Sequence, residues 1–424
     1  MAARRTTAGQ RRVSTVVRGP MSVRPRPGSF DRVQIKTFPG RVAAAVLALE
    51  VLAVTCFAFA WRPLDLWIYV LGGRAVGDDA TLYTQQQAEH WFTYPPFAAI
   101  LFDPLSALPF LGVRVAWELA CVAALAWVIV VAGRLAGRQL PVVPLLAAAL
   151  ILEPVWHTLF LGQVNLFLLA LILTDVWLVS RGRCGGFLIG AAAAIKLTPA
   201  IFIVFLLLGR RYRAAAIASS TFVACGLVAY LAAPAASRLY WSGLFRDTTR
   251  VGASYIGNQS PFGALNRLLD MHVGSWYLAI PLFFGLGGLL VARAYLRRGD
   301  WLTAAVATGV TGLLVSPISW THHWIWVVPA LLVLLLRGAH RWAALGFLVY
   351  ALAPMWFTPH DGGPGEYGPH GLITLIANSY LLAGVAFLGY LGWTLRSDTS
   401  LAGRVPASSA SSGSSTVEKV PAAL

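Results

Sequence analysis

Long apolar segments separated by short polar ones dominate this sequence. Blocks of roughly 20 residues with few charges are typical of helices that span a membrane. We predict twelve apolar helical segments, at about 42–60, 112–133, 141–155, 164–180, 184–195, 198–209, 214–233, 277–295, 302–316, 322–337, 342–354 and 371–393. The pattern therefore predicts an all-helical, polytopic integral membrane protein.

Composition supports this prediction and limits the partners. Of the 424 residues, 58% are hydrophobic and only 12% are charged, about half the charged fraction that is usual in soluble domains. The formal net charge of +16 comes from arginines that lie between the apolar segments. These arginines form no basic face interleaved with aromatic residues, which argues against nucleic acid as a partner.

The arginines also predict the orientation in the membrane. Short arginine clusters follow alternate apolar segments, for example at 134–138, 181–183, 210–213 and 297–298. Because positive loops stay on the cytoplasmic side, this arrangement puts both termini in the cytoplasm. Three longer polar segments are then outside, at 61–95, 234–276 and 355–370.

Two stretches do not fit a simple crossing. Residues 96–110 contain Asp103 and are flanked by prolines, so we expect a re-entrant or surface helix there. Segments 184–195 and 198–209 are too short to cross ~30 Å at 1.5 Å per residue. We expect them to be broken helices that meet at Lys196-Leu197-Thr198-Pro199.

The ends of the chain differ in composition from the middle. Residues 1–41 are rich in arginine and contain one acid, Asp31, whereas 397–424 are rich in Ser, Ala and Gly. Both compositions are typical of disordered segments. We therefore predict a membrane domain at 42–396 between two disordered cytoplasmic tails, 1–41 and 397–424.

Two ionisable residues are candidates for chemistry. Asp65 follows the first apolar segment among Leu, Trp and Ile residues. Partial desolvation would raise its proton affinity, as a general base requires, although Asp is also a favoured helix cap. Lys196 lies between two apolar half-segments, where an unpaired ammonium is costly. A phosphate or Asp65 is a suitable partner, and snorkelling to the interface is the alternative.

Polar and aromatic residues at the outer ends of segments form a second group of candidates. Tyr94 precedes two prolines, and Gln163 and Asn165 open the segment that begins near 164. They are expected either to bind sugar hydroxyls or to serve as a rigid turn and helix caps. Trp320 belongs to the same group.

Anion-binding residues are expected at two further places. His322 and His323 lie at the outer end of a segment, where one of them is expected to donate to a phosphate oxygen or to be structural. Arg250 lies in a basic outer loop, against the positive-inside trend, and an anionic partner would account for it. The same loop contains Asn258 and Gln259, which we assign to sugar binding.

The sequence predicts neither a metal site nor a cofactor. It contains no Walker loop, no G-x-G-x-x-G after a strand, no zinc pattern and no Asp-x-Asp pair. Adjacent histidines on a helix point about 100° apart and make a poor joint metal site. A substrate that is carried on a lipid needs no nucleotide-binding site.

These motifs, taken in order, resemble a known family. They are Asp65-Leu66-Trp67-Ile68-Tyr69, Gly72-Gly73-Arg74, Leu82-Tyr83, Phe92-Thr93-Tyr94-Pro95-Pro96-Phe97, Gly162-Gln163-Val164-Asn165, Lys196-Leu197-Thr198-Pro199, Asn258-Gln259-Ser260 and Ser316-Pro317-Ile318-Ser319-Trp320-Thr321-His322-His323-Trp324. Residues 42–393 resemble the actinobacterial polyprenol-phosphate-mannose-dependent mannosyltransferases of glycosyltransferase family 87, which have the GT-C fold.

The resemblance implies an activity. Polyprenyl-phosphate mannose would be the donor, and a mannosylated phosphatidylinositol the acceptor, at the outer face of the plasma membrane. Asp65 would be the catalytic base, and His322, His323, Lys196 and Arg250 would stabilise the leaving phosphate. Addition of the fifth mannose in phosphatidylinositol mannoside synthesis and α-1,2 branching of lipomannan and lipoarabinomannan both remain open. The alternatives from other classes are a lipid-linked sugar transporter, suggested by Lys196 in a broken helix, and a ligase that moves a whole glycan.

Overall fold

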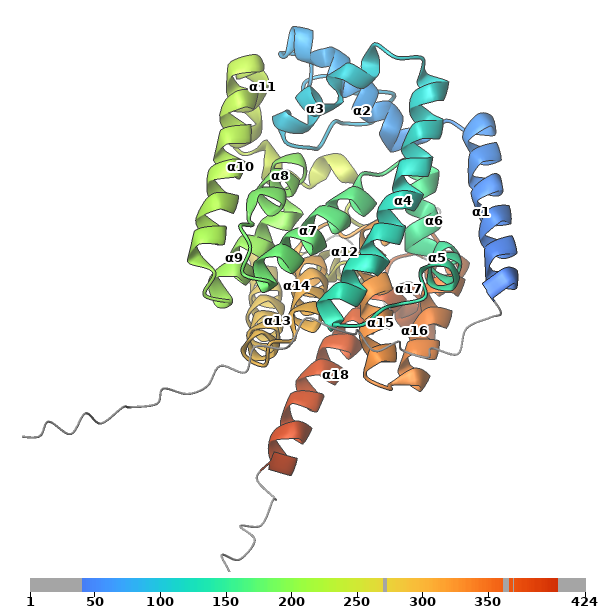
Figure 1. Ribbon diagram of the computed structural model, residues 1–424. Coiled ribbons are helices and arrows are strands. Elements are labelled where there is room, and N and C mark those ends of the chain that lie inside the picture. Colours follow the sequence, from blue (N-terminus) through green and yellow to red (C-terminus); the bar gives the residue numbers. More distant parts are fainter. Residues whose placement is uncertain (1–39, 270–272, 361–365, 369, 403–424) are drawn as a thin grey trace, which may run out of the picture.

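The protein is a bundle of helices (Figure 1). The computed structural model describes residues 40–269, 273–360, 366–368 and 370–402. Within these ranges there is no β-strand, and only two isolated β-bridges are present. The α-helices are α1 (Gly40–Ala60), α2 (Leu64–Arg74), α3 (Pro96–Ser106), α4 (Phe110–Ala136), α5 (Val142–Leu150), α6 (Glu153–Leu161), α7 (Asn165–Ser180), α8 (Phe187–Ile195), α9 (Ile201–Leu208), α10 (Tyr212–Ala232), α11 (Pro234–Trp241), α12 (Pro261–Leu268), α13 (Ala279–Arg297), α14 (Trp301–Val315), α15 (Val327–Leu336), α16 (His340–Leu352), α17 (Leu372–Ala377) and α18 (Ser379–Ala402).

Each of the twelve predicted apolar segments coincides with one helix or with consecutive short helices. The segment 141–155 contains α5 and the first turn of α6, and these two helices meet at an angle of 73°. Among the residues that the structure describes, four helices are long and apolar enough to cross a membrane alone, and a fifth crossing is added if the bent pair counts as one span. The all-helical membrane protein is thus confirmed, whereas the number of twelve spans is not.

The predicted helix break at Lys196 is present. Helix α8 ends at Ile195, and a 3-10 turn, η2 (Thr198–Ala200), leads into α9. Lys196 has an extended backbone, with φ −149° and ψ 132°. Pro199 has no N–H and lies in the first turn of η2, where proline is favoured at the start of a new helical segment. The break therefore follows from the local sequence.

Helix α3 is short and packs against α2 and α10. Both α2 and α3 lie at the upper end of the bundle, beside α11 (Figure 1). This position agrees with the expected surface or re-entrant helix at 96–110. Asp65 belongs to α2, and Tyr94 immediately precedes the N-cap of α3.

The C-terminal helix is longer than the sequence indicated. Helix α18 continues past Arg396 to Ala402, so the first part of the segment predicted as a disordered tail is helical. The rest of that tail, 403–424, and nearly all of the N-terminal one, 1–39, lie outside the described residues.

Candidate active site

Asp65 lies just after the short connection between α1 and α2. Only residues 61–63 separate α1 from α2, and Asp65 is in the first turn of α2. The N-cap of α2 is Pro63, which makes no side-chain hydrogen bond to the helix. Asp65 is therefore not the cap residue. Its half-buried side chain lines two cavities at once.

The amide of Gln163 is fixed by two tyrosine hydroxyls and acts on the Asp65 carboxylate. The hydroxyls of Tyr69 and Tyr94 lie 2.8 Å from each other, and each lies 2.9 Å from Oε1 of Gln163. The amide oxygen is thus occupied by two tyrosine hydroxyls, and a hydrogen bond from the Gln163 side chain lowers the pKa of Asp65. Gln163 is in the turn between α6 and α7, which places it directly against α2.

The surroundings of Asp65 set its proton affinity. Burial raises its pKa above the ordinary 3.8, and the hydrogen bond from Gln163 and the charges of Lys196, His157 and His90 oppose this rise. Burial likewise raises the pKa of Tyr94, so its hydroxyl keeps its proton. A carboxylate with raised proton affinity beside a cavity is a suitable proton acceptor.

Lys196 is fixed by two side chains from other helices. Its Nζ lies 3.0 Å from Oδ1 of Asn165 and 3.0 Å from Nε2 of His323. It also lies 5.3 Å from the centre of the Tyr94 ring. The helix break and these contacts together direct one ammonium group into the cavity that Asp65 lines. Lys196 thus does not snorkel alone to the interface.

Asn165 is a structural link within this cluster. Its Nδ2 donates to the backbone carbonyl of His322 at 3.0 Å, while its Oδ1 accepts from Lys196. The polar side-chain atoms of Asn165 are therefore used inside the protein. The prediction that it binds sugar is replaced by a role in joining α7 to the loop that carries both histidines.

His322 and His323 lie in a 3-10 helix, η6 (Thr321–Trp326), that precedes α15. Their rings are perpendicular, with centres 4.7 Å apart. His323 contacts Lys196, whereas both ring nitrogens of the buried His322 have no hydrogen-bond partner in the described part of the protein. A buried polar group without a partner is costly, and His322 is also among the residues that line both cavities.

Two cavities share Asp65 among the residues that line them. The first, of about 540 Å³, is lined by the cationic side chains Lys196, Arg246 and Arg250 and by His323. We call it the cationic cavity. The second, of about 1010 Å³, is lined by Trp91, Trp156, Phe160, Tyr255, Trp320, Trp356 and Phe357, and we call it the aromatic cavity. Asp65, Arg250, Trp320 and His322 line both.

Arg250 reaches the site from the outer loop. Its Nη1 donates to the backbone carbonyl of Tyr83 at 2.7 Å, and its Nε lies 3.4 Å from Asp247. The guanidinium also lies over the Trp91 ring, 4.3 Å from its centre. The basic loop noted in the sequence is thus anchored beside both cavities, with Arg250 among the residues that line them.

Asn258 and Gln259 are not on the wall of either cavity. Both are fully buried. Asn258 donates to the carbonyls of Ala253 and Pro317 and accepts from the amides of Ser260 and Ser319. Gln259 donates to the carbonyls of Ile256 and Ala377 and accepts from the amide of Tyr380. Their assignment to sugar binding is therefore corrected, because protein partners occupy their polar atoms.

Two further residues, which the sequence did not single out, belong to the aromatic cavity: His157 lines it, and Glu153 contacts His157 from behind. Glu153 is fully buried in the first turn of α6, and His157 one turn later lines the aromatic cavity beside Asp65. An acid and a histidine four residues apart at the end of an apolar segment were the available signal. Tyr69, which donates a hydrogen bond to Gln163, belongs to the motif at 65–69, and the sequence alone indicated no function for it.

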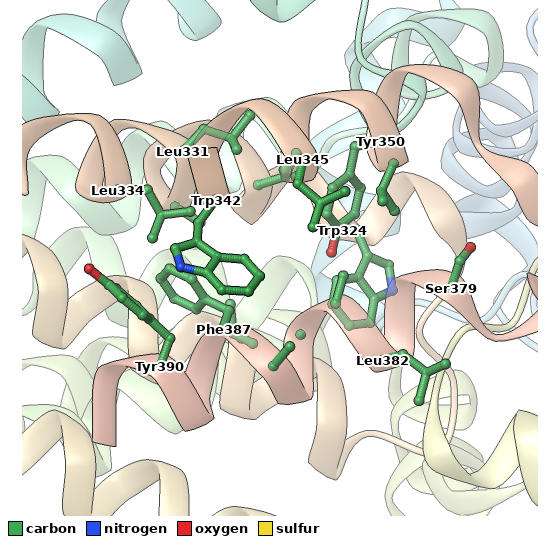
Figure 2. Close-up of a pocket in the computed structure, with 18 of the residues that line it drawn as sticks. Trp324, Leu331, Leu334, Trp342, Leu345, Tyr350, Ser379, Leu382, Phe387 and Tyr390 are labelled. Carbon is green, nitrogen blue, oxygen red and sulfur yellow. The ribbon is translucent and has the colours of Figure 1, made fainter. Parts of the chain in front are cut away.

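A third hollow lies apart from these side chains. It has a volume of about 860 Å³ and is lined by α15, α16 and α18, without a charged side chain. Figure 2 shows Trp324, Trp342, Leu382 and Phe387 directed into it. Its walls are mostly apolar, and the hydroxyls among them come from Tyr350, Ser379 and Tyr390.

A metal centre has no counterpart among the residues that the structure describes. No three His, Cys, Asp or Glu side chains there are grouped to hold an ion. The expectation that no metal or cofactor takes part remains a prediction.

The fold and the site define a membrane-embedded enzyme with a carboxylate between a cationic and an aromatic cavity. The sequence profile of glycosyltransferase family 87 matches residues 92–317, and curated relatives match over most of the chain. The chain belongs to glycosyltransferase family 87. No solved structure matches it significantly.

Three relatives illustrate the likeness. The polyprenol-phosphate-mannose-dependent α-(1-2)-phosphatidylinositol pentamannoside mannosyltransferase of Mycolicibacterium smegmatis is 35% identical over 85% of this chain and 96% of its own. The protein with the same description from Mycobacterium tuberculosis is 33% identical over 85% of this chain and 89% of its own. A phosphatidylinositol mannoside mannosyltransferase of M. tuberculosis, with the same donor and linkage, is 32% identical over 75% of this chain and 81% of its own.

Proposed function

We propose that this protein transfers mannose from polyprenyl-phosphate mannose to a hydroxyl of a mannosylated phosphatidylinositol and forms an α-1,2 linkage. The descriptions of its relatives, which name this donor, linkage and acceptor class, support the proposal. The observation that carries it in this chain is the position of Asp65 at the junction of two cavities of different character.

The cationic cavity suits the donor. Lys196, Arg250 and the unpartnered His322 surround a volume that Asp65 also reaches. Hydrogen bonds from cations to phosphate oxygens are short and strong. Preorganised donors also stabilise the charge that develops on a leaving phosphate. These residues are therefore assigned to the donor phosphate, with Lys196 held for the task by Asn165 and His323.

The aromatic cavity suits the acceptor. Trp91, Tyr255, Trp320 and Trp356 provide apolar ring surfaces, while His90 and His157 provide polar groups on the same wall. Aromatic rings with a few placed polar groups are usual in small-molecule sites. Trp320, predicted to contact sugar, keeps this assignment. Tyr94 and Gln163, also predicted to bind sugar, are assigned instead to orienting Asp65.

The reaction is a single displacement. The Asp65 carboxylate takes the proton of the acceptor hydroxyl, and that oxygen forms a bond to the anomeric carbon of the donor mannose. The bond from the anomeric carbon to the phosphate oxygen breaks with its electron pair, which stays on the polyprenyl phosphate. Attack opposite the phosphate inverts a β-linked donor to an α-linked product. Because phosphate leaves as an anion, cations assist it and a second carboxylate is not required.

The finer features of the proposal follow the same argument. Asp65, Tyr94 and Arg250 belong to segments that the arginine pattern puts outside, so we place the reaction at the outer face of the plasma membrane, with both termini in the cytoplasm. The helical bundle is assigned to the GT-C class. Addition of the fifth mannose is favoured over branching of lipomannan because two relatives described as pentamannoside enzymes span 85% of this chain.

Membranes from a host without related transferases provide the test. They are loaded with radiolabelled polyprenyl-phosphate mannose and with purified phosphatidylinositol tetramannoside or lipomannan. The expected result is labelled pentamannoside whose new mannose is released by an α-1,2-specific mannosidase. Labelling of lipomannan alone would favour the branching activity, and the absence of any mannosyl transfer by an intact, folded protein would contradict the proposal.

A further inference from the structure

Glu153 is a buried carboxylate with three separate hydrogen-bond donors. His157 Nδ1 and Trp356 Nε1 lie 2.9 and 3.0 Å from its Oε1, and the hydroxyl of Tyr380 lies 3.0 Å from its Oε2. The four residues belong to α6, to the 3-10 turn η7 (Pro354–Phe357) and to α18. All three partners are able to donate, as an ionised carboxylate requires.

The Glu153 carboxylate fixes the orientation of the His157 ring. Nδ1 contacts Glu153 and also lies 2.8 Å from Oγ1 of Thr321. Since a carboxylate accepts and a ring N–H donates, Nδ1 is engaged within the protein, and Nε2 is the ring nitrogen that remains for a ligand. In the described part of the protein, the polar contacts of His157 all involve Nδ1. The ring is further packed against Trp356 and His322, with centres 5.9 and 5.4 Å away.

The position of His157 separates its role from that of Asp65. Its side chain is 18% exposed and lines the aromatic cavity, whereas Asp65 lines both cavities. A base for the transfer must reach the point where donor and acceptor meet, which only Asp65 of these two does. His157 faces the volume assigned to the acceptor alone.

We propose that His157, oriented by Glu153, binds the acceptor glycan through Nε2 by accepting a hydrogen bond from a sugar hydroxyl. The inference rests on the proposed function, because it takes the aromatic cavity as the acceptor site. His157 contacts the substrate, and Glu153 is a positioning residue that acts through His157. The contact fixes the acceptor sugar on the wall beside Asp65.

The experiment compares kinetic constants of the full-length enzyme in detergent, with polyprenyl-phosphate mannose and phosphatidylinositol tetramannoside. His157→Ala is expected to raise the acceptor KM about tenfold, the effect of one lost hydrogen bond. Donor KM and kcat should stay within about twofold. His157→Gln, which offers an oxygen near the position of Nε2, should recover part of the acceptor affinity. His360→Ala is the matched control, because His360 also packs on Trp356, with ring centres 5.7 Å apart, but lines neither cavity.

A double-mutant cycle tests the role of Glu153. Glu153→Gln alone should raise the acceptor KM about threefold and should add nothing to His157→Ala, since Glu153 acts through the ring. A Glu153 with only a structural role would add its effect in both backgrounds. An unchanged acceptor KM in both His157 variants overturns the inference, as does a fall in kcat alone. Absence of wild-type turnover would instead count against the proposed function, so the two failures are distinguishable.

Discussion

The hydroxyl of Tyr69, on the same helix as Asp65, donates a hydrogen bond to Oε1 of Gln163 at 2.9 Å. This contact joins α2 to the turn before α7, and a hydrogen bond from the Gln163 side chain lowers the pKa of Asp65. A side chain fixed in this way before a substrate arrives needs little rearrangement during a reaction.

The first prediction concerns the base itself. Asp65→Asn preserves the shape of the side chain but removes its ability to take a proton. We expect kcat to fall by about 10²–10⁴, with melting temperature and donor affinity close to wild type. Steady-state turnover with purified protein measures this, alongside donor binding and thermal unfolding. Near-normal turnover would eliminate Asp65 as the base.

The second prediction concerns pH. Burial raises the pKa of Asp65 above 3.8, so activity should be lost as pH falls through that raised value and the carboxylate is protonated. The Gln163 hydrogen bond lowers this pKa, and Gln163→Met removes the bond. The acid limb of kcat/KM should therefore move to higher pH in Gln163→Met. An acid limb at the same pH in both proteins would argue against the amide–carboxylate contact.

The third prediction concerns the cation at the helix break. Lys196→Met removes a charged hydrogen-bond donor, a change of about 1.5–3 kcal/mol for a charged partner. The donor KM should rise by roughly 10–100-fold. The inhibition constant of free polyprenyl phosphate should rise by the same factor. Arg181→Met, at an exposed arginine that lines neither cavity, is the control for loss of positive charge. Equal effects of the two substitutions would remove Lys196 from the phosphate site.

The fourth prediction concerns a close backbone approach beside Asp65. Gly162 has φ +67°, and a Cβ there would lie 2.6 Å from Cβ of Leu66 and 3.1 Å from Cβ of Pro63. Gly162→Ala should therefore destabilise the protein by about 1–3 kcal/mol and displace Asp65, which lowers kcat. Thermal unfolding and turnover measure the two effects. Gly182→Ala, also at positive φ but with open space around it, controls for backbone strain without a clash.

The fifth prediction concerns orientation in the membrane. Gln86 lies in the segment expected outside, and Cys184 lies exposed in a loop expected in the cytoplasm. In intact cells, a membrane-impermeant maleimide should label Gln86→Cys in a background without the native cysteines. A variant that keeps Cys184 as its one cysteine should be labelled only after the cells are opened. Labelling of both in intact cells would invalidate the arginine-based topology.

The sequence predicted the apolar helices and the break at Lys196 because both depend on local composition. Hydropathy locates an apolar helix, and Pro199 marks the interruption. The number of crossings does not follow in this way, since a short apolar helix in the interior has the same composition as one that spans the bilayer. Helix α18 extended past Arg396 because a Ser- and Thr-containing segment is able to continue an existing helix.

The sequence indicated site residues only where the residue type has few structural roles in an apolar environment. Asp65 and Lys196 are charged residues beside apolar segments, and their cost in that environment indicated a function. Asn258 and Gln259 are amides, which bind backbone groups as readily as sugars, and the structure assigns them to backbone. The Glu153–His157 pair was missed because three of its partners come from residues 321, 356 and 380, which are remote in sequence.

The helices that face lipid differ in length from those that surround the site. In the most apolar stretches of α1, α10 and the helix containing α13, only 11%, 22% and 17% of the residues are buried. In contrast, twelve of the fifteen residues of α14 are buried. Hydrophobic mismatch with the bilayer is therefore met mainly by the long outer helices, which adapt by tilting. The shorter helices near Asp65, such as α14, are covered by protein. A change in membrane thickness therefore affects the site through the contacts between the long outer helices and these shorter inner ones.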